Sequence, residues 1–186
     1  MTRTDDIPET FDERTLLVQM LHYTQDTAVM KVSGLSEELA RLAPLPGSPL
    51  MSPANVLNHL RWVERSWINH DLFGGEDDGP WSKEDPDAEF RQGSELPIAE
   101  VIGLYEEEAA RTRAVFAEVD LDMVRRNEGR TQPVTARWIL NHLIEETARH
   151  NGHLDILRGW PTGPPATDLA QIPSWRGQSR RCCRRA

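Results

Sequence analysis

The stretch EETARHNGHLDILRGW, residues 145–160, places a glutamate and a histidine among leucines. On a helical wheel of about 100° per residue, Glu146 and His150 coincide with the centre of the apolar stripe that Leu143 and Leu154 also occupy. They are one turn apart, about 6 Å along the axis, so both side chains can reach a single ion. A carboxylate and an imidazole are costly to remove from water, and a bound cation would offset that cost.

A further histidine, His59, lies near the edge of the apolar stripe of another expected helix and can point inward. With Glu146 and His150 it gives two imidazoles and one carboxylate. This ligand set suits zinc, nickel or iron, with positions left open for water and substrate. The pattern also fits simpler interpretations. His59 alone is compatible with a hydrogen-bonded core histidine, and Glu146 with His150 is compatible with a buried pair or a pair partly exposed at the end of a bundle.

Other side chains give weaker signals. His70 shares a helix face with His59 but is about 16 Å further along the axis, so it cannot share the ion. We interpret His22 as a surface or packing residue and Glu106–Glu108 as a solvated face. Four tryptophans at helical spacings are typical of a core or interface: Trp62, Trp67, Trp138 and Trp160. The sequence contains no glycine-rich phosphate loop, nucleophile elbow or Cys/His zinc spacing.

The elements that position these residues are expected to be helices, because apolar residues recur with a 3.6-residue period in four segments. We expect helices over residues 12–32, from Pro53 to Gly74-Gly75, over 97–119 and over 135–160, with Ser52 capping the second and a short capped turn at Ser36. Residues 75–96 are interpreted as an acidic, aperiodic connection. These segments favour an all-α fold, a four-helix bundle whose sites are built from side chains on facing helices.

The 186 residues suffice for one domain, residues 1–160, and a Pro/Gly/Arg-rich tail, residues 161–186, expected to be weakly ordered. A hydrophobic content of 38% with 27% charged residues fits a soluble globular protein, and no apolar run is long enough to span a membrane. The net charge of −9 disfavours nucleic acid and anionic membrane as partners. The N-terminus resembles no export signal, so we expect a cytoplasmic location. The adjacent Cys182 and Cys183 in the tail are interpreted as exposed, reducible thiols.

The motifs NHLRWVERSW (58–67) and NHLIEETARHNGHLDILRG (141–159) resemble those of the DinB-like metalloprotein superfamily, over about residues 12–160. The resemblance implies an up-up-down-down style four-helix bundle that holds a divalent metal through one histidine of the second helix and two ligands of the last. Glu146 stands where many members have histidine, and this departure resembles the mycothiol-dependent maleylpyruvate isomerase branch. That branch has a His, Glu, His ligand set, which implies His59, Glu146 and His150. His153 stands where the family often has glutamine.

Members of this superfamily use the metal to bind and activate a low-molecular-weight thiol, and a metal-bound thiol is deprotonated near neutral pH. Our first hypothesis is therefore a thiol S-transferase or isomerase that depends on a divalent metal, with zinc favoured, and acts on a small electrophile with that thiol as cosubstrate. The alternative is a non-catalytic metal- or ligand-binding bundle that senses or sequesters. A homodimer is left open. Metal-assisted hydrolysis is a third hypothesis, and His153 is the nearest candidate for its general base and the catalytic residue that we single out.

Overall fold

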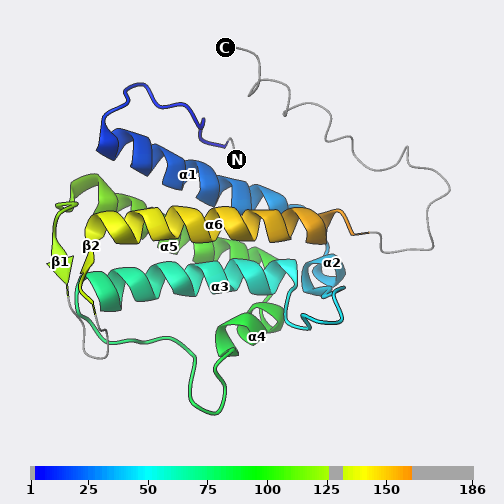
Figure 1. Cartoon of the computed structure of the whole chain (residues 1–186). Helices are drawn as coiled ribbons and strands as arrows, with labels where there is room; N and C mark the ends of the chain where they lie inside the picture. Colours follow the sequence, from blue (N-terminus) through cyan, green and yellow to red (C-terminus); the bar gives the residue numbers. More distant parts are fainter. Residues whose placement is uncertain (1–2, 126–131, 161–186) are drawn as a thin grey trace.

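The structure, a computed structural model, describes residues 3–125 and 132–160. Its elements are α1 (Glu13–Val32), α2 (Glu37–Arg41), α3 (Pro53–Ser66), the π-helix η1 (Trp67–Leu72), α4 (Ala88–Glu95), α5 (Ile98–Glu118), β1 (Val124–Arg125), β2 (Val134–Thr135) and α6 (Ala136–Arg158) (Figure 1). The long elements are helices, which confirms the expected all-α fold. The expected tail, residues 161–186 with Cys182 and Cys183, lies outside the described residues.

Local signals in the sequence fix where the helices begin. Asp12, Ser52 and Thr135 each accept a hydrogen bond from the backbone N–H three residues later. Each bond satisfies a donor that the first helical turn leaves unpaired. The cap at Ser52, followed by Pro53, confirms the predicted start of α3. The predicted capped turn after residue 35 is the short helix α2.

The four long helices, α1, α3, α5 and α6, pack as a four-helix bundle (Figure 1). α1 and α6 run in the same direction, because Glu13 pairs with Arg137 in their first turns and Lys31 with Asp155 in their last. α3 and α5 run the opposite way (Figure 1). The order along the chain is therefore up-down-down-up, and the up-up-down-down order implied by the resemblance is wrong. The short connection through α2 turns the chain back, whereas the long connection through α4 lets α5 run parallel to α3.

The core of the bundle consists of two apolar clusters separated by polar side chains. One cluster includes Leu60 and Tyr105, and the other includes Phe116 and Leu140. On each long helix, one polar residue with at most 1% exposure stands between members of the two clusters; these residues, which we call the polar layer, are Gln25, Glu64, Thr112 and Thr147. Buried polar groups destabilise a fold unless they are hydrogen-bonded, and within this layer Gln25 bonds to Glu64.

The second predicted helix has the expected length but changes its hydrogen bonding. At Trp67 the α-helix α3 continues as η1, in which Phe73 N donates to Ile68 O at 3.1 Å. The chain then leaves the helix at Gly74, whose φ of 72° suits glycine, so the predicted end is confirmed. π-Helical turns are rare and frequently lie at functional sites.

Residues 75–96 contain a helix that the sequence analysis missed. The segment is not wholly aperiodic, because α4 forms within it and packs on α3. This helix has only eight residues, with Phe90 as its large apolar side chain, so it carries no 3.6-residue hydrophobic period. Its close approach depends on Gly93, where a Cβ would lie 2.6 Å from the backbone oxygen of Ala54.

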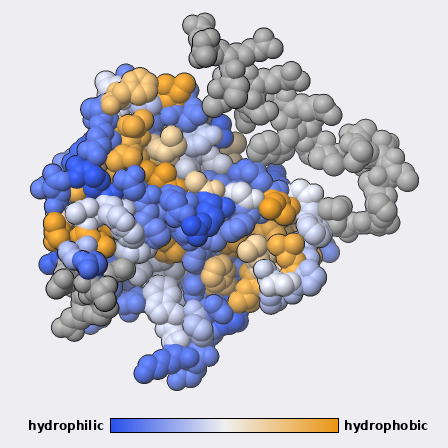
Figure 2. Space-filling model, viewed as in Figure 1, coloured by the Kyte–Doolittle hydropathy of each residue, from blue (hydrophilic) through white to orange (hydrophobic). Residues whose placement is uncertain are grey.

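The face of the bundle that α6 crosses is largely hydrophilic in its middle, with apolar patches nearer its edges (Figure 2). The paired side chains of Glu145 and Arg149 on α6 are 50% and 59% exposed. In the part of the chain that the structure describes, no helix has the length and apolar character needed to cross a membrane.

Candidate metal centre

The facing sides of α3 and α6 bring His59, Glu146 and His150 together. One potential ligand atom from each residue lies within 4.8 Å of the other two. Glu146 Oε1 is the shared contact, 3.4 Å from His59 Nε2 and 3.1 Å from His150 Nε2. The three side chains are only 10–16% exposed. The predicted pair on α6 therefore meets the predicted histidine of α3 where the two helices face each other.

The two contacts that Glu146 makes in this triad have the dimensions of a divalent-cation site. Metal–ligand bonds of roughly 2.0–2.1 Å place two ligands of a tetrahedral ion about 3.3 Å apart. The two contacts of Glu146 Oε1 are close to that separation. Three protein ligands leave a coordination position for a water or a substrate, as in catalytic zinc sites. The same ligand set also suits nickel and iron, so the geometry does not select one metal.

Charge holds the triad together in the absence of a cation. Hydrogen bonding to His150, and then to His59, lowers the pKa of Glu146 far below its ordinary value, although burial opposes the change. Burial acts to lower the pKa of His59, but the hydrogen bond to Glu146 and the nearby carboxylate of Glu89 outweigh it and raise that pKa. Glu146 is therefore ionised and attracts the imidazoles. A divalent cation would replace protons here, so metal binding and proton release are linked.

The two other histidines of α6 have different surroundings. His153 Nδ1 lies 3.2 Å from His150 Nδ1, so one of these nitrogens donates to the other. Burial, and then the charge of His150, lowers the pKa of His153 and favours its neutral form. His142 instead packs against Trp67 and Trp138, with ring centroids 4.8 and 5.1 Å apart. The structure thus places His153 beside the triad, and its catalytic role stays a prediction.

Glu108 has surroundings that the sequence analysis predicted wrongly. Glu106 and Glu107 are exposed, as a solvated face requires, but Glu108 is only 5% exposed. Its Oε2 pairs with Arg65 at 3.4 Å and with Arg111 at 3.2 Å. Each helical residue is rotated by about 100° from the one before, so three consecutive glutamates cannot share one face.

The remaining histidines and tryptophans lie outside the triad. His70 Nδ1 is 2.9 Å from Gly75 O, so His70 stands apart from His59 as predicted. His22 is partly buried on α1, and burial lowers its pKa. The prediction of core or interface positions holds for Trp62, which is 8% exposed, whereas Trp138 and Trp160 are 47% and 40% exposed.

Sequence reasoning missed the residues of α4 that contact the triad. Phe90 stacks on His59 with ring centroids 4.3 Å apart and 12° between the ring planes. Glu89 Oε1 lies 3.5 Å from His59 Nδ1. The lone phenylalanine in the acidic stretch DPDAEF is the sequence signal that could have pointed to this contact.

Glu64 was also missed, although a helical wheel could have found it about 80° from Val56 on the buried side of α3. Gln25 Nε2 donates to both of its carboxyl oxygens at 2.9 Å. Burial raises the pKa of Glu64 to about 7, while the hydrogen bonds from Gln25 and the nearby hydroxyls of Thr112 and Tyr105 act in the opposite direction. Glu64 is therefore about half protonated at pH 7 and mostly protonated below it.

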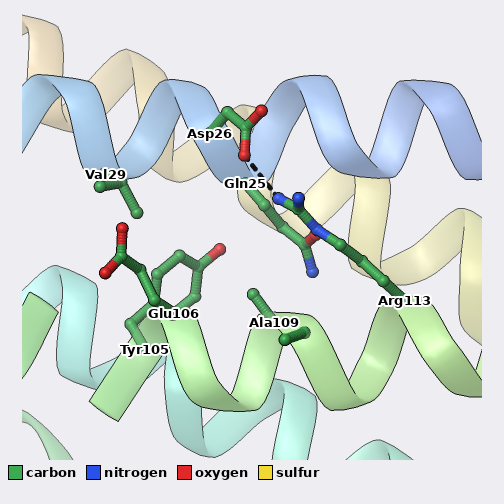
Figure 3. Close-up of a pocket in the computed structure, with 8 residues that line it drawn as sticks. Gln25, Asp26, Val29, Tyr105, Glu106, Ala109 and Arg113 are labelled. Carbon is green, nitrogen blue, oxygen red and sulfur yellow. Dashed lines mark hydrogen bonds and ion pairs between the residues drawn. The ribbon is translucent and has the colours of Figure 1, made fainter. Parts of the chain in front are cut away.

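A pocket of about 190 Å³ opens between α1 and α5 (Figure 3). Arg113 reaches across it, donating to Gln25 Oε1 at 2.7 Å and to Asp26 Oδ1 at 2.6 Å. Tyr105 forms part of the lining, and none of the triad residues does. Because Arg113, Gln25 and Asp26 are already bonded to one another across it, we interpret this pocket as structural. It ties α1 to α5 and, through Gln25, connects the surface to the polar layer.

Comparison with known proteins gives one family match. A family model described as mycothiol-S-transferase matches residues 16–163 of the chain, which include the whole triad. A search of curated proteins finds no match.

Proposed function

The chain belongs to the mycothiol-S-transferase family, and from this premise we propose that it is a divalent-metal-dependent thiol transferase or isomerase. The family supports a low-molecular-weight thiol, mycothiol, as cosubstrate and a small electrophile as substrate. The meeting of His59, Glu146 and His150 supports the metal. This meeting is the observation that carries the proposal, because a poorly exposed carboxylate between two imidazoles is a ready ligand set for a cation.

We propose His59, Glu146 and His150 as the ligands and zinc as the metal, with nickel and iron as alternatives. When bound, the cation supplies Lewis acidity that favours ionisation of a thiol near neutral pH. Glu146 offsets one positive charge and the neutral imidazoles offset none, so an anionic sulfur remains attracted to the site. In transfer, the sulfur forms a bond to an electrophilic carbon, and the electron pair leaves with the displaced group.

We propose that His153 orients His150. If His150 ligates through Nε2, its ring proton is on Nδ1, which donates to His153 Nδ1 across the observed 3.2 Å. His153 then carries its own proton on Nε2. To act as a general base, the role expected from the sequence, it would have to take a proton at Nδ1 and give up this hydrogen bond. In His153→Gln, an amide oxygen replaces the accepting nitrogen, so metal should be retained, and lost turnover would indicate a base.

Elemental analysis of protein purified without an affinity tag tests the metal site. We expect about one divalent ion per chain. The variants His59→Ala and His150→Ala should each lose it, because two ligands hold a cation much less tightly than three. Full occupancy in the double variant would exclude this site.

A turnover assay tests the reaction. The metal-loaded protein is mixed with a chromogenic dinitrophenyl halide and mycothiol, with glutathione and a thiol-free mixture as controls. We expect metal-dependent formation of the S-aryl conjugate with mycothiol, with release of the halide. Binding of mycothiol without turnover of any electrophile in a panel would favour the non-catalytic binding bundle. Light scattering on the same preparation tests whether the chain forms a homodimer.

A further inference from the structure

Helix α4 is attached to α3 by contacts that fix its position beside His59. Asn58 Nδ2 donates to the backbone oxygen of Glu89 at 2.6 Å, and Trp62 Nε1 donates to Gln92 Oε1 at 2.8 Å. The close approach of Gly93 to the backbone of Ala54 lies in the same interface. The donors come from buried side chains of α3, so α4 is held by the bundle and does not depend on a metal for its position.

This attachment places two side chains of α4 against the imidazole of His59. Phe90 stacks on the ring, and Glu89 Oε1 lies 3.5 Å from Nδ1. Among the described residues, neither His59 Nδ1 nor Glu89 Oε2 has a hydrogen-bond partner, although both atoms are buried. Buried polar atoms are nearly always paired, so two such atoms in adjoining groups require an explanation.

We infer that Glu89 is a positioning residue that selects the tautomer of His59 needed to bind the proposed metal. His59 Nε2 faces Glu146, so this nitrogen must offer its lone pair to the ion and the ring proton must lie on Nδ1. Nδ1 faces Glu89, whose carboxylate can accept that proton in a hydrogen bond. Metal-ligating histidines commonly donate their second N–H to a carboxylate in this way. The inference rests on the proposed metal site and adds a residue from a third helix.

Glu89 also supplies charge. It is 9% exposed, so its carboxylate interacts with the site across a region from which most water is excluded. Its charge adds to that of Glu146 at longer range, because Glu89 contacts His59 and is not itself one of the proposed ligands. Electrostatic attraction is stronger where water is excluded, so loss of the Glu89 charge weakens cation binding even if the hydrogen bond is kept.

Competition for Zn²⁺ between the protein and a chromogenic chelator tests this inference. Removing a carboxylate partner of a ligating histidine typically weakens metal affinity about 10–100-fold. We expect a loss in that range for Glu89→Ala. Glu89→Gln keeps an oxygen that can accept from Nδ1 but carries no charge, so its loss should be smaller. Glu95→Ala, an exposed position on the same helix, is the matched control and should bind Zn²⁺ like the wild type.

The visible spectrum of bound Co²⁺ separates positioning from a general structural effect. A misplaced His59 changes the ligand geometry, so Glu89→Ala should shift the Co²⁺ bands. A purely structural role would lower the melting temperature of the metal-free protein and leave those bands unchanged. If Glu89→Ala does not fold, the Zn²⁺ affinity of Glu89→Gln is the test, because glutamine has nearly the same shape as glutamate.

Two negative results are distinguishable. If Glu89→Ala and Glu89→Gln fold and match the Glu95→Ala control in Zn²⁺ affinity and Co²⁺ spectrum, the assignment of Glu89 is overturned while the triad stands. If the wild-type protein binds neither metal, the proposed function is rejected and the assignment of Glu89 is rejected with it.

Discussion

Glu64 provides a sharp test of the electrostatics of the bundle. The residue is 1% exposed, in the polar layer, and its hydrogen bonds from the protein come from the amide of Gln25. Burial raises its pKa from an ordinary 4.5 to about 7. At pH values between these two numbers, the folded protein binds a proton at Glu64 that the unfolded chain has released.

This difference fixes the sign of the pH dependence. Stability rises with pH where the unfolded state holds more protons, and here the folded state holds more, so the contribution of Glu64 falls with pH. It is fully present below about pH 4.5 and is lost as the pH rises through about 7. Each pKa unit corresponds to about 1.4 kcal/mol, so the shift lowers the free energy of unfolding by about 3 kcal/mol at high pH.

Urea unfolding of the wild type and of Glu64→Gln at several pH values between 5 and 8 measures this term, with chelator present throughout. The variant mimics the shape of the neutral acid and has no charge to bury. The two proteins should therefore have similar stability at pH 5, and the variant should become the more stable by about 3 kcal/mol at pH 8. Glu106→Gln removes an exposed carboxylate of α5 and serves as the control.

The difference between the wild type and the variant is the informative quantity, because titration of all other groups cancels in it. A difference that stays constant from pH 5 to pH 8 would show that Glu64 does not change protonation on folding, and the reasoning would be refuted. A fall in variant stability relative to the wild type as pH rises would show that Glu64 is buried as the carboxylate and depends on its charge.

Three further outcomes are expected. Glu146→Gln should weaken Zn²⁺ affinity, measured by chelator competition, more than His142→Gln does, because only Glu146 contacts both triad histidines. The reverse order would show that the site has been assigned to the wrong face of α6. Added Zn²⁺ should raise the melting temperature and a chelator should lower it, since an ion that binds the folded state alone stabilises it by mass action; an unchanged transition would favour a simple buried pair. Gly93→Ala should lower the free energy of unfolding in urea by about 1–3 kcal/mol, because the added Cβ meets the backbone of Ala54. An unchanged free energy of unfolding in this variant would mean that α4 packs less closely on α3.

The sequence predicted those features that depend on one helix at a time. Helix starts followed from caps such as Ser52, and the pairing of Glu146 with His150 followed from their four-residue spacing. The meeting of this pair with His59 required only that two apolar faces pack together. Each of these inferences uses the 3.6-residue period, which the bundle preserves.

The features that the sequence did not predict depend on contacts between segments. α4 is held by polar side chains of α3 and by one glycine contact. A helix held in this way needs no apolar stripe, so its sequence shows no 3.6-residue hydrophobic period. The direction of α5 depends on the length and path of the preceding connection. The burial of Glu108 follows from its place on the buried face of α5, but the Arg65 that pairs with its charge comes from a neighbouring helix, which a single helix does not reveal.

Glu64, Glu108 and Glu146 show why a buried carboxylate is an ambiguous signal in a sequence. Each avoids the cost of desolvation differently. Glu108 pairs with two arginines, and Glu64 keeps its proton up to about pH 7. Glu146 stays ionised between two imidazoles, which can exchange their protons for a metal ion, whereas arginines cannot. The chemistry of the partners, and not burial of the carboxylate itself, is therefore what singles out the cluster between α3 and α6 as the candidate site.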